Sequence, residues 1–136
     1  MEILELSITG FPAFALYFAV SLVLLALFLV IYLRITPYQE IALIRQGNVA
    51  SALSLSGTTL GFVIPLAQAI AQSGNLPDML LWGGIALVVQ LLVYLVVARL
   101  LPDIGKHIAD GSVAHGATLG AFSLATGILN AACMTY

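Results

Sequence analysis

Four long runs of apolar residues, separated by short polar segments, dominate the pattern along this chain. They cover Phe11–Leu33, Val49–Ala71, Met79–Leu101 and Val113–Cys133. Each run is long enough to cross a hydrocarbon core of ~30 Å as a helix that rises ~1.5 Å per residue. The backbone of a helix satisfies its own hydrogen bonds in lipid, and the alternation of a barrel strand is missing. We therefore expect an all-α membrane protein with four transmembrane helices.

The second and fourth runs begin with the same pattern. Residues 44–66 align with residues 108–130 at an offset of 64 positions, with polar-Gly-polar-Val-Ala at the start of each run. Chance similarity between apolar helices would match leucines but would not reproduce this start, so we interpret the chain as a duplication. The predicted single domain, 1–136, contains repeat one at 11–73 and repeat two at 76–136. The identical pairs are Ile44/Ile108, Gly47/Gly111, Val49/Val113, Ala50/Ala114, Leu55/Leu119, Leu60/Leu124 and Ile64/Ile128.

The first run is flanked by features that predict its ends. Met1–Gly10 carries two glutamates and no Lys or Arg, so we expect a short tail and not the basic start of a cleavable signal. Pro12 suits the first turn of the helix, and Pro37 follows its end. Leu22–Leu33 is uniformly apolar with few small residues, so the first helix should face mainly lipid.

The second and fourth predicted helices carry small and polar side chains in steps of three and four. In a bilayer, close approach at small residues and hydrogen bonds between helices supply the attraction. Such a seam either lines a polar path or only holds helices together. Pro65 also removes a backbone donor, which should free the carbonyl of Gly61. The candidate residues for the path or seam are Ser51, Ser54, Thr58, Gly61, Pro65, Gln68, Gly116, Thr118, Gly120, Ser123, Gly127 and Asn130.

Two further polar residues fall within predicted helices. Gln90 lies in the middle of the third, where an unpartnered amide costs free energy, so we expect a hydrogen bond to the second or fourth helix. A substrate contact is the alternative. His115 lies in the first turn of the fourth helix. Ionisable residues in membranes are functional candidates, and histidine titrates near neutral pH, so His115 is a candidate pH-sensitive group. Its position also allows it simply to face water.

The loop after the first helix contains a short apolar repeat. Tyr38, Ile41 and Ile44 recur every third residue, which predicts a helical turn at the level of the lipid headgroups. The loop is then either a connector or a docking surface for a cytoplasmic protein.

The loop after the third helix contains candidate metal ligands. Asp103, His107 and Asp110 could share one face, with His115 nearby. The ligand spacing is loose and no cysteine accompanies it, so we predict no metal site and no other cofactor.

Composition and charge add an orientation. Hydrophobic residues make up 62% of the chain and charged residues 7%, which leaves too little polar surface for a protein surrounded by water. All Lys and Arg residues fall in loops 34–48 and 99–112. The positive-inside rule predicts that these loops are cytoplasmic and that both termini lie outside the cytoplasm. The two tandem two-helix repeats then share one orientation. The basic residues are Arg34, Arg45, Arg99 and Lys106.

The sequence carries no motif typical of an enzyme. It has no glycine-rich phosphate loop, no nucleophile beside a base, no paired carboxylates and no basic patch for nucleic acid. Its single cysteine, Cys133, excludes an internal disulfide. We therefore predict neither enzymatic activity nor a nucleic-acid partner.

The duplicated start of the second and fourth helices carries a family resemblance. Gln46–Ala52 and Asp110–Gly116 resemble the YjfL-like bacterial inner-membrane family, which is the domain of unknown function 350 family. The similarity spans nearly the whole chain. It implies a bacterial inner-membrane protein with four helices in two repeats. That family has no established activity, so the resemblance assigns no functional residue.

Two functions from different classes fit these observations. One is a homo-oligomeric channel or transporter for an ion or small solute. Its second and fourth helices would hold the copies together and line the path with Ser54, Thr58, Thr118, Ser123 and Asn130. The alternative is a non-transporting membrane scaffold or stress-sensing protein, which docks a cytoplasmic peripheral protein through its two basic loops. The lipid bilayer is a partner in both.

Overall fold

The computed structural model describes residues 2–134, which form six helices. Four of these helices, α1, α3, α4 and α6, are long and apolar enough to cross a membrane. The predicted all-α architecture with four spanning helices is therefore confirmed. The elements are α1 (Glu2–Ile35), α2 (Glu40–Arg45), α3 (Val49–Gln72), α4 (Leu76–Leu100), α5 (Ile104–Ala109) and α6 (Val113–Cys133).

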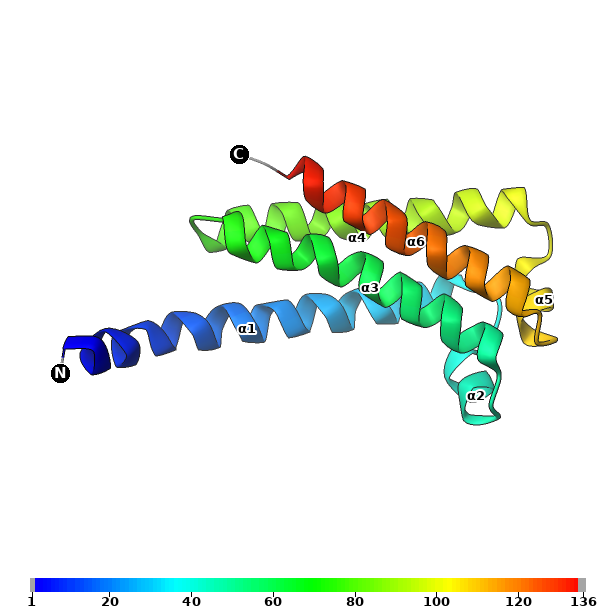
Figure 1. The fold of residues 1–136 in the computed structure, drawn as a ribbon, viewed down its shortest axis with the longest axis horizontal. Coiled ribbons are helices and arrows are strands. Elements are labelled where there is room, and N and C mark those ends of the chain that lie inside the picture. The colour runs from blue at the N-terminus through cyan, green and yellow to red at the C-terminus, as the bar shows by residue number, and fades with distance from the viewer. Residues whose placement is uncertain (1, 135–136) are drawn as a thin grey trace.

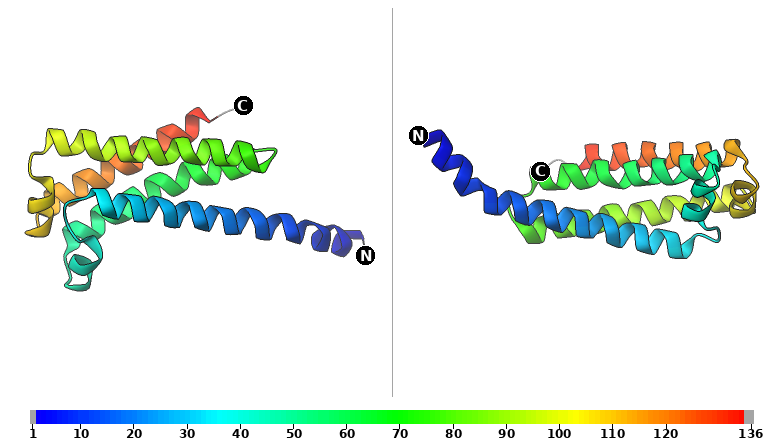
Figure 2. Two further views of the ribbon diagram at one scale, coloured as in Figure 1. Left: turned by 180° about the vertical axis from the view of Figure 1, so that it is seen from behind. Right: turned by 90° about the horizontal axis from the view of Figure 1, so that it is seen from below.

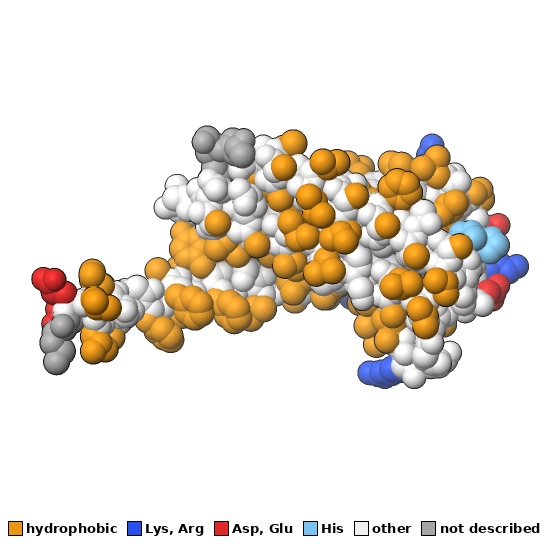
Figure 3. Space-filling model, viewed as in Figure 1, with side chains coloured by type: hydrophobic (Ala, Val, Ile, Leu, Met, Phe, Trp, Pro, Cys, Tyr) orange, Lys and Arg blue, Asp and Glu red, His pale blue; other side chains and the backbone are white. Residues whose placement is uncertain are grey.

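The four long helices lie roughly alongside one another and alternate in direction (Figure 1). The chain runs one way through α1 and α4 and returns through α3 and α6, so the short helices α2 and α5 lie together at one end (Figure 2). We call this the basic end because it carries all four Lys and Arg residues. Figure 3 shows these cations gathered there, while the glutamates of the first turn of α1 lie at the opposite extreme.

α1 begins at Glu2, so the prediction of a short tail before Phe11 was wrong. Pro12 lies inside the helix and not in its first turn. A proline removes only one backbone donor and bends a helix without having to end it, and the N-terminal part of α1 bends away from the other helices (Figure 2). The helix therefore continues through a segment whose side chains are exposed.

One stripe of α1 packs against the other helices. Leu24, Phe28 and Tyr32 recur every fourth residue and are buried, while most of the helix is exposed. The Phe28 ring stacks on Phe62 of α3 with 4.5 Å between centroids, and Tyr32 meets the edge of Tyr94 of α4 at 5.7 Å. Most of α1 is exposed, which agrees with the expectation of a mainly lipid-facing helix, and this one stripe joins it to α3 and α4.

The most extensive contact in the chain is between α3 and α6. At five glycines along this contact, an added Cβ would overlap the backbone of the facing helix. Such backbone-to-backbone approach is the packing that small residues permit in membranes. The small-residue seams therefore face each other within one chain. The glycines are Gly57, Gly61, Gly116, Gly120 and Gly127.

The segments that lead into α3 and α6 have matching local structures. Two residues after each of the six-residue helices α2 and α5 comes a glycine with positive φ, +84° at Gly47 and +90° at Gly111. The next residues, Asn48 and Ser112, cap the following helices by accepting a hydrogen bond from the backbone N–H three residues on. The short helix predicted near Ile41 is present as α2.

Asn48 also links the two halves of the chain. Its side-chain Nδ2 donates to the carbonyl oxygens of Ile108 at 3.0 Å and Ala109 at 3.3 Å, while its Oδ1 accepts from the Ser51 N–H at 2.8 Å. We predict that Asn48→Ala lowers the free energy of unfolding by about 2 kcal/mol, because it loses a cap worth ~1 kcal/mol together with the hydrogen bonds to α5. Thermal unfolding in detergent, followed by circular dichroism, measures the difference.

The matched control is Asn75→Ala, since Asn75 caps α4 by accepting from the Asp78 N–H but is exposed. This change should cost only the cap, about 1 kcal/mol or less. Equal losses in the two variants would show that the bonds from Asn48 to α5 contribute nothing.

Candidate functional site

Buried hydroxyl groups form a line from the basic end toward the middle of the helices. The Tyr38 hydroxyl lies 3.4 Å from Ser54 Oγ and also pairs with Tyr32. The Thr58 hydroxyl lies 3.4 Å from Tyr32 Oη and 3.3 Å from Ser123 Oγ. All five residues are buried. We call Tyr38, Ser54, Tyr32, Thr58 and Ser123 the hydroxyl line.

Gln90 of α4 lies at the inner end of the hydroxyl line and is fully buried. Its Nε2 donates to the carbonyl oxygen of Gly61 at 3.0 Å and to that of Ser123 at 3.1 Å. The cross-helix hydrogen bond predicted for Gln90 is present and reaches both α3 and α6. Pro65 supplies no N–H to Gly61, so the Gln90 amide occupies the carbonyl that the proline leaves free. The Gln90 Oε1 has no partner among the described residues.

Glu40, in the first turn of α2, lies beside the outer end of the hydroxyl line and is only 1% exposed. Its Oε1 accepts a hydrogen bond from the Thr36 hydroxyl, and its Oε2 has no partner among residues 2–134. Burial raises the pKa of Glu40 to about 7, and the Thr36 hydrogen bond opposes this shift. Burial likewise raises the pKa of Tyr38. Sequence reasoning missed Glu40, because a lone acid in a loop looks solvated and no spacing marks it as buried.

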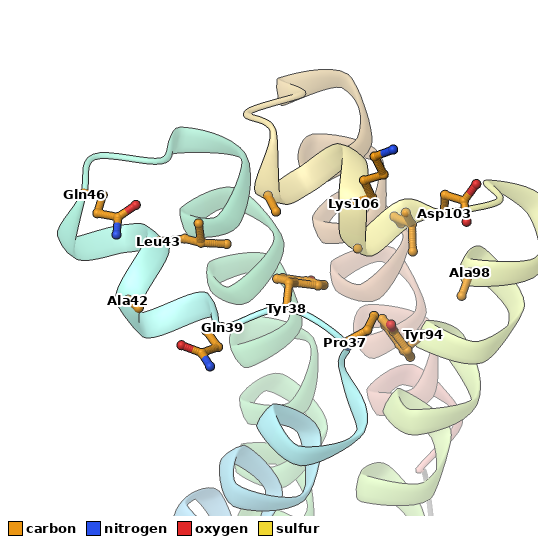
Figure 4. A pocket seen from close by; sticks show the side chains of 13 residues that line it. Pro37, Tyr38, Gln39, Ala42, Leu43, Gln46, Tyr94, Ala98, Asp103 and Lys106 are labelled. Atoms are coloured by element: carbon orange, nitrogen blue, oxygen red, sulfur yellow. The ribbon is translucent and has the colours of Figure 1, made fainter.

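Two hollows open at the basic end and share Tyr38. The larger, about 620 Å³, lies between α2, α4 and α5, with Tyr38 and Tyr94 toward its floor and Asp103 and Lys106 on the α5 side (Figure 4). The other, about 570 Å³, is bordered by the end of α1 and by α2, and its lining includes Glu40 and Arg45. The outer end of the hydroxyl line is therefore accessible from the basic end.

His115 lies apart from the hydroxyl line. Its Nδ1 is 2.6 Å from the Ser112 hydroxyl, and its ring stacks on His107 with 4.2 Å between centroids. The side chain is half-buried at the start of α6. Within residues 2–134, no three His, Cys, Asp or Glu side chains are grouped to hold a metal. Asp103 is the residue just before α5 and has φ +58°.

The structure divides the remaining candidate residues into three sets. Ser54, Thr58 and Ser123 meet in the hydroxyl line, whereas Thr118, Gln68 and Asn130 are half-buried, and no hydrogen bond among the described residues joins them to it. The Asn130 Nδ2 has no partner in residues 2–134. The buried members at helix contacts are Ser51, Gly61, Pro65, Gly116, Gly120 and Gly127.

Comparisons with known proteins agree with this membrane architecture. Residues 5–134 match the model of the family described as Domain of Unknown Function (DUF350). The chain is 45% identical over 124 residues to the UPF0719 inner membrane protein YjfL of Escherichia coli strain K12, covering 91% of this chain and 94% of that protein. It is 32% identical over 88 residues to the UPF0719 transmembrane protein YshE of Bacillus subtilis strain 168, covering 65% of this chain and 66% of that protein.

No solved structure matches the chain. The inner-membrane relative and the four apolar helices support a multi-pass protein of the inner membrane. The family match covers nearly all of residues 2–134, and it confirms the YjfL-like resemblance seen in the sequence. The chain therefore belongs to the DUF350 family of membrane proteins, whose function is unknown.

Proposed function

We propose that this protein transports an ion or small solute across the bacterial inner membrane, and that a proton is the ion its interior suits best. The observation that carries the proposal is the hydroxyl line, which connects the basic end to Ser123 and Gln90 in the middle of the helices. Polar groups inside a membrane protein are costly, and they commonly mark the paths of ions and protons.

The packing around the hydroxyl line favours a proton over a larger solute. α3 and α6 touch through glycine backbones beside Thr58 and Ser123, which leaves no room for a hydrated ion between them. A hydroxyl both donates and accepts hydrogen bonds, so neighbouring hydroxyls can pass a proton without an open pore. Of the path residues predicted from the sequence, the proposal therefore keeps Ser54, Thr58 and Ser123, which belong to the hydroxyl line, and leaves out Thr118 and Asn130.

Proton flux into liposomes that contain the purified protein and a pH-sensitive dye tests this function. We expect a pH gradient to dissipate faster than in empty liposomes. Thr58→Val should slow the flux about tenfold or more, because a gap in the line adds at least ~1.4 kcal/mol to the barrier. Its control is Thr59→Val, which makes the same change at the neighbouring half-buried position. Wild-type flux no faster than empty liposomes, or equal flux in the two variants, would count against the proposal.

A homo-oligomeric state is part of this proposal, on a basis that differs from the one the sequence indicated. The seams of α3 and α6 are occupied by each other, so a second copy would contact other surfaces. α1 extends beyond the other helices with exposed aromatic rings, including Phe11, Phe14 and Phe18, and offers such a surface (Figure 2). Native mass spectrometry of the wild-type protein should detect complexes of more than one copy. A strictly monomeric protein would contradict the proposed homo-oligomeric state.

We further propose that the chain is a tandem repeat and that the basic end lies in the cytoplasm. The paired short helices, positive-φ glycines and caps that precede α3 and α6 support two repeats in one orientation. In a Cys133→Ser background, we predict that Lys106→Cys is labelled by an impermeant maleimide only from the cytoplasm and Gly74→Cys only from outside. Both positions are exposed, so labelling reports on orientation. The opposite pattern would reverse the proposed topology.

A scaffold is the second candidate function, and the hollow of about 620 Å³ at the basic end favours it. With the proposed topology this hollow faces the cytoplasm, where its rim of Asp103 and Lys106 could contact a peripheral protein (Figure 4). A scaffold would need no hydroxyl line, so the comparison of Thr58→Val with Thr59→Val separates the two functions.

A further inference from the structure

We infer that Glu40 is a proton-binding site, which exchanges its proton with the hollow at the basic end and supplies the hydroxyl line. The inference rests on the proposed function for the fate of the proton, while the existence of the site depends only on the surroundings of Glu40.

The backbone and the side chain of Glu40 are both fixed in place. Thr36, just beyond the end of α1, donates its hydroxyl to Oε1, and Ser51 of α3 donates to the backbone oxygen of Glu40 at 3.2 Å. These bonds hold the first turn of α2 against the end of α1 and the start of α3. The side chain therefore remains inside, with 1% of the residue exposed.

The free carboxyl oxygen makes this position unsuited to a permanent charge. Oε2 is buried and has no hydrogen-bond partner within residues 2–134. A buried carboxylate without a counter-ion is costly, and binding a proton removes its charge. Burial raises the pKa of Glu40 to about 7, so the proton is gained and lost near neutral pH.

The groups that surround Glu40 leave it as the titrating member of this cluster. Three tyrosines interact electrostatically with Glu40: Tyr32 of α1, Tyr94 of α4, and Tyr38 between α1 and α2. Tyrosine ordinarily titrates near pH ~10. α3 contributes the uncharged Ser51. Arg45 lines the same hollow from an exposed position. Between about pH 5 and 9, Glu40 is therefore the group of this cluster that changes charge.

The hollow gives a proton a route to Glu40. At about 570 Å³ it is far larger than the ~30 Å³ that one water occupies in the liquid, and its lining includes both Glu40 and Tyr38. The Tyr38 hydroxyl in turn pairs with Ser54 and Tyr32. Glu40 thus lies between solvent at the basic end and the first members of the hydroxyl line.

The raised pKa also predicts how stability depends on pH. Because the folded-state pKa lies above the unfolded value, the folded protein holds a proton that the unfolded chain loses between pH ~4.3 and about 7. The contribution of protonated Glu40 is complete below this window and disappears as pH rises through it. The melting temperature of the wild type should therefore fall across the window more than that of Glu40→Gln, which stays neutral and still accepts from Thr36.

Carbon-13 NMR of the full-length protein in nanodiscs, with labelled glutamate carboxyl groups, tests the site directly. The chain contains only three glutamates, and Glu2 and Glu5 are exposed in the first turns of α1. We expect one carboxyl resonance to titrate with a midpoint near pH 7 and to vanish in Glu40→Gln. The other two resonances should remain in Glu40→Gln, so that the missing one is assigned to Glu40. A Glu40 midpoint between pH 4 and 5 would overturn the inference.

Repeating the titration with sodium, potassium or a large organic cation as the only salt tests the identity of the ligand. A proton site keeps its midpoint in all three salts. A midpoint that moves down with sodium or potassium would instead make Glu40 a metal-cation site and reject the inference. Failure of the liposome flux with an intact titration near pH 7 would remove the transport function and leave the proton site standing.

Discussion

Gly120→Leu is expected to leave little folded protein, because a side chain at this position has no space to occupy. A Cβ on Gly120 would overlap the carbonyl oxygen of Leu53, and this obstacle is helix backbone that cannot rotate aside. Accommodating even the first carbon requires α3 and α6 to move apart along the largest contact in the chain. We predict a loss of about 3 kcal/mol or more in the free energy of unfolding.

Unfolding by SDS in mixed micelles, followed by circular dichroism, measures this loss, and Gly84→Leu is its control. Gly84 is half-buried on α4, and within residues 2–134 a Cβ there would meet no atom of another helix within 4 Å. The same substitution at Gly84 should be close to neutral, since leucine favours a helix more than glycine does. Gly57→Ala should lower the free energy of unfolding, because its Cβ would overlap the Gly120 backbone from the α3 side. Equal stability of Gly120→Leu and Gly84→Leu would contradict the backbone contact.

This contact shows what a pattern of small residues determines and what it leaves open. Gly61, Gly120 and their neighbours predict that two helix faces approach closely, because only small side chains permit that approach. The same spacing does not identify the partner, which can belong to the same chain or to another copy. The sequence therefore indicated four of the five glycines of this contact, whereas the pairing of α3 with α6 appears only in the folded chain.

The beginning of the chain was misjudged for a related reason. Glu2 and Glu5 indicate a polar segment, and Pro12 is well suited to the first turn of a helix. Neither feature prevents a helix that begins earlier, because acidic residues favour a helix N-terminus and a proline inside a helix only bends it. The actual start at Glu2 was thus compatible with the sequence but not required by it.

The burial of Glu40 could not be predicted from local patterns in the sequence. Its burial requires Thr36, the short helix α2 and Ser51 to come together, and they do so only when α3 returns alongside α1. Periodicity describes the faces of one helix, whereas this position is created by a bend between two helices. The four apolar runs of the sequence contain no acidic residue, and Glu40 is buried just outside them.

Gln90, by contrast, could be assigned from the sequence, and it leads to the second large effect. Gln90→Leu removes the donor to the carbonyl oxygens of Gly61 and Ser123 and leaves both without that bond in the interior. We predict a loss of about 1–3 kcal/mol in the free energy of unfolding, measured by the same SDS titration. Gln68→Leu is the control, because Gln68 is half-buried and should stay within about 0.5 kcal/mol of the wild type.

The dependence on Gln90 should be weaker when residue 65 can donate a hydrogen bond. Pro65 lacks an N–H, so the Gly61 carbonyl depends on Gln90, whereas Pro65→Ala restores a backbone donor to that carbonyl. We therefore expect Gln90→Leu to cost less in the Pro65→Ala background. The coupling should be roughly 0.6–1.7 kcal/mol, between the average and the maximum typical of hydrogen bonds between membrane helices. A double-mutant cycle of wild type, both single variants and the double variant isolates this coupling. A coupling of zero would mean that the proline and the glutamine act independently and that Gly61 does not connect them.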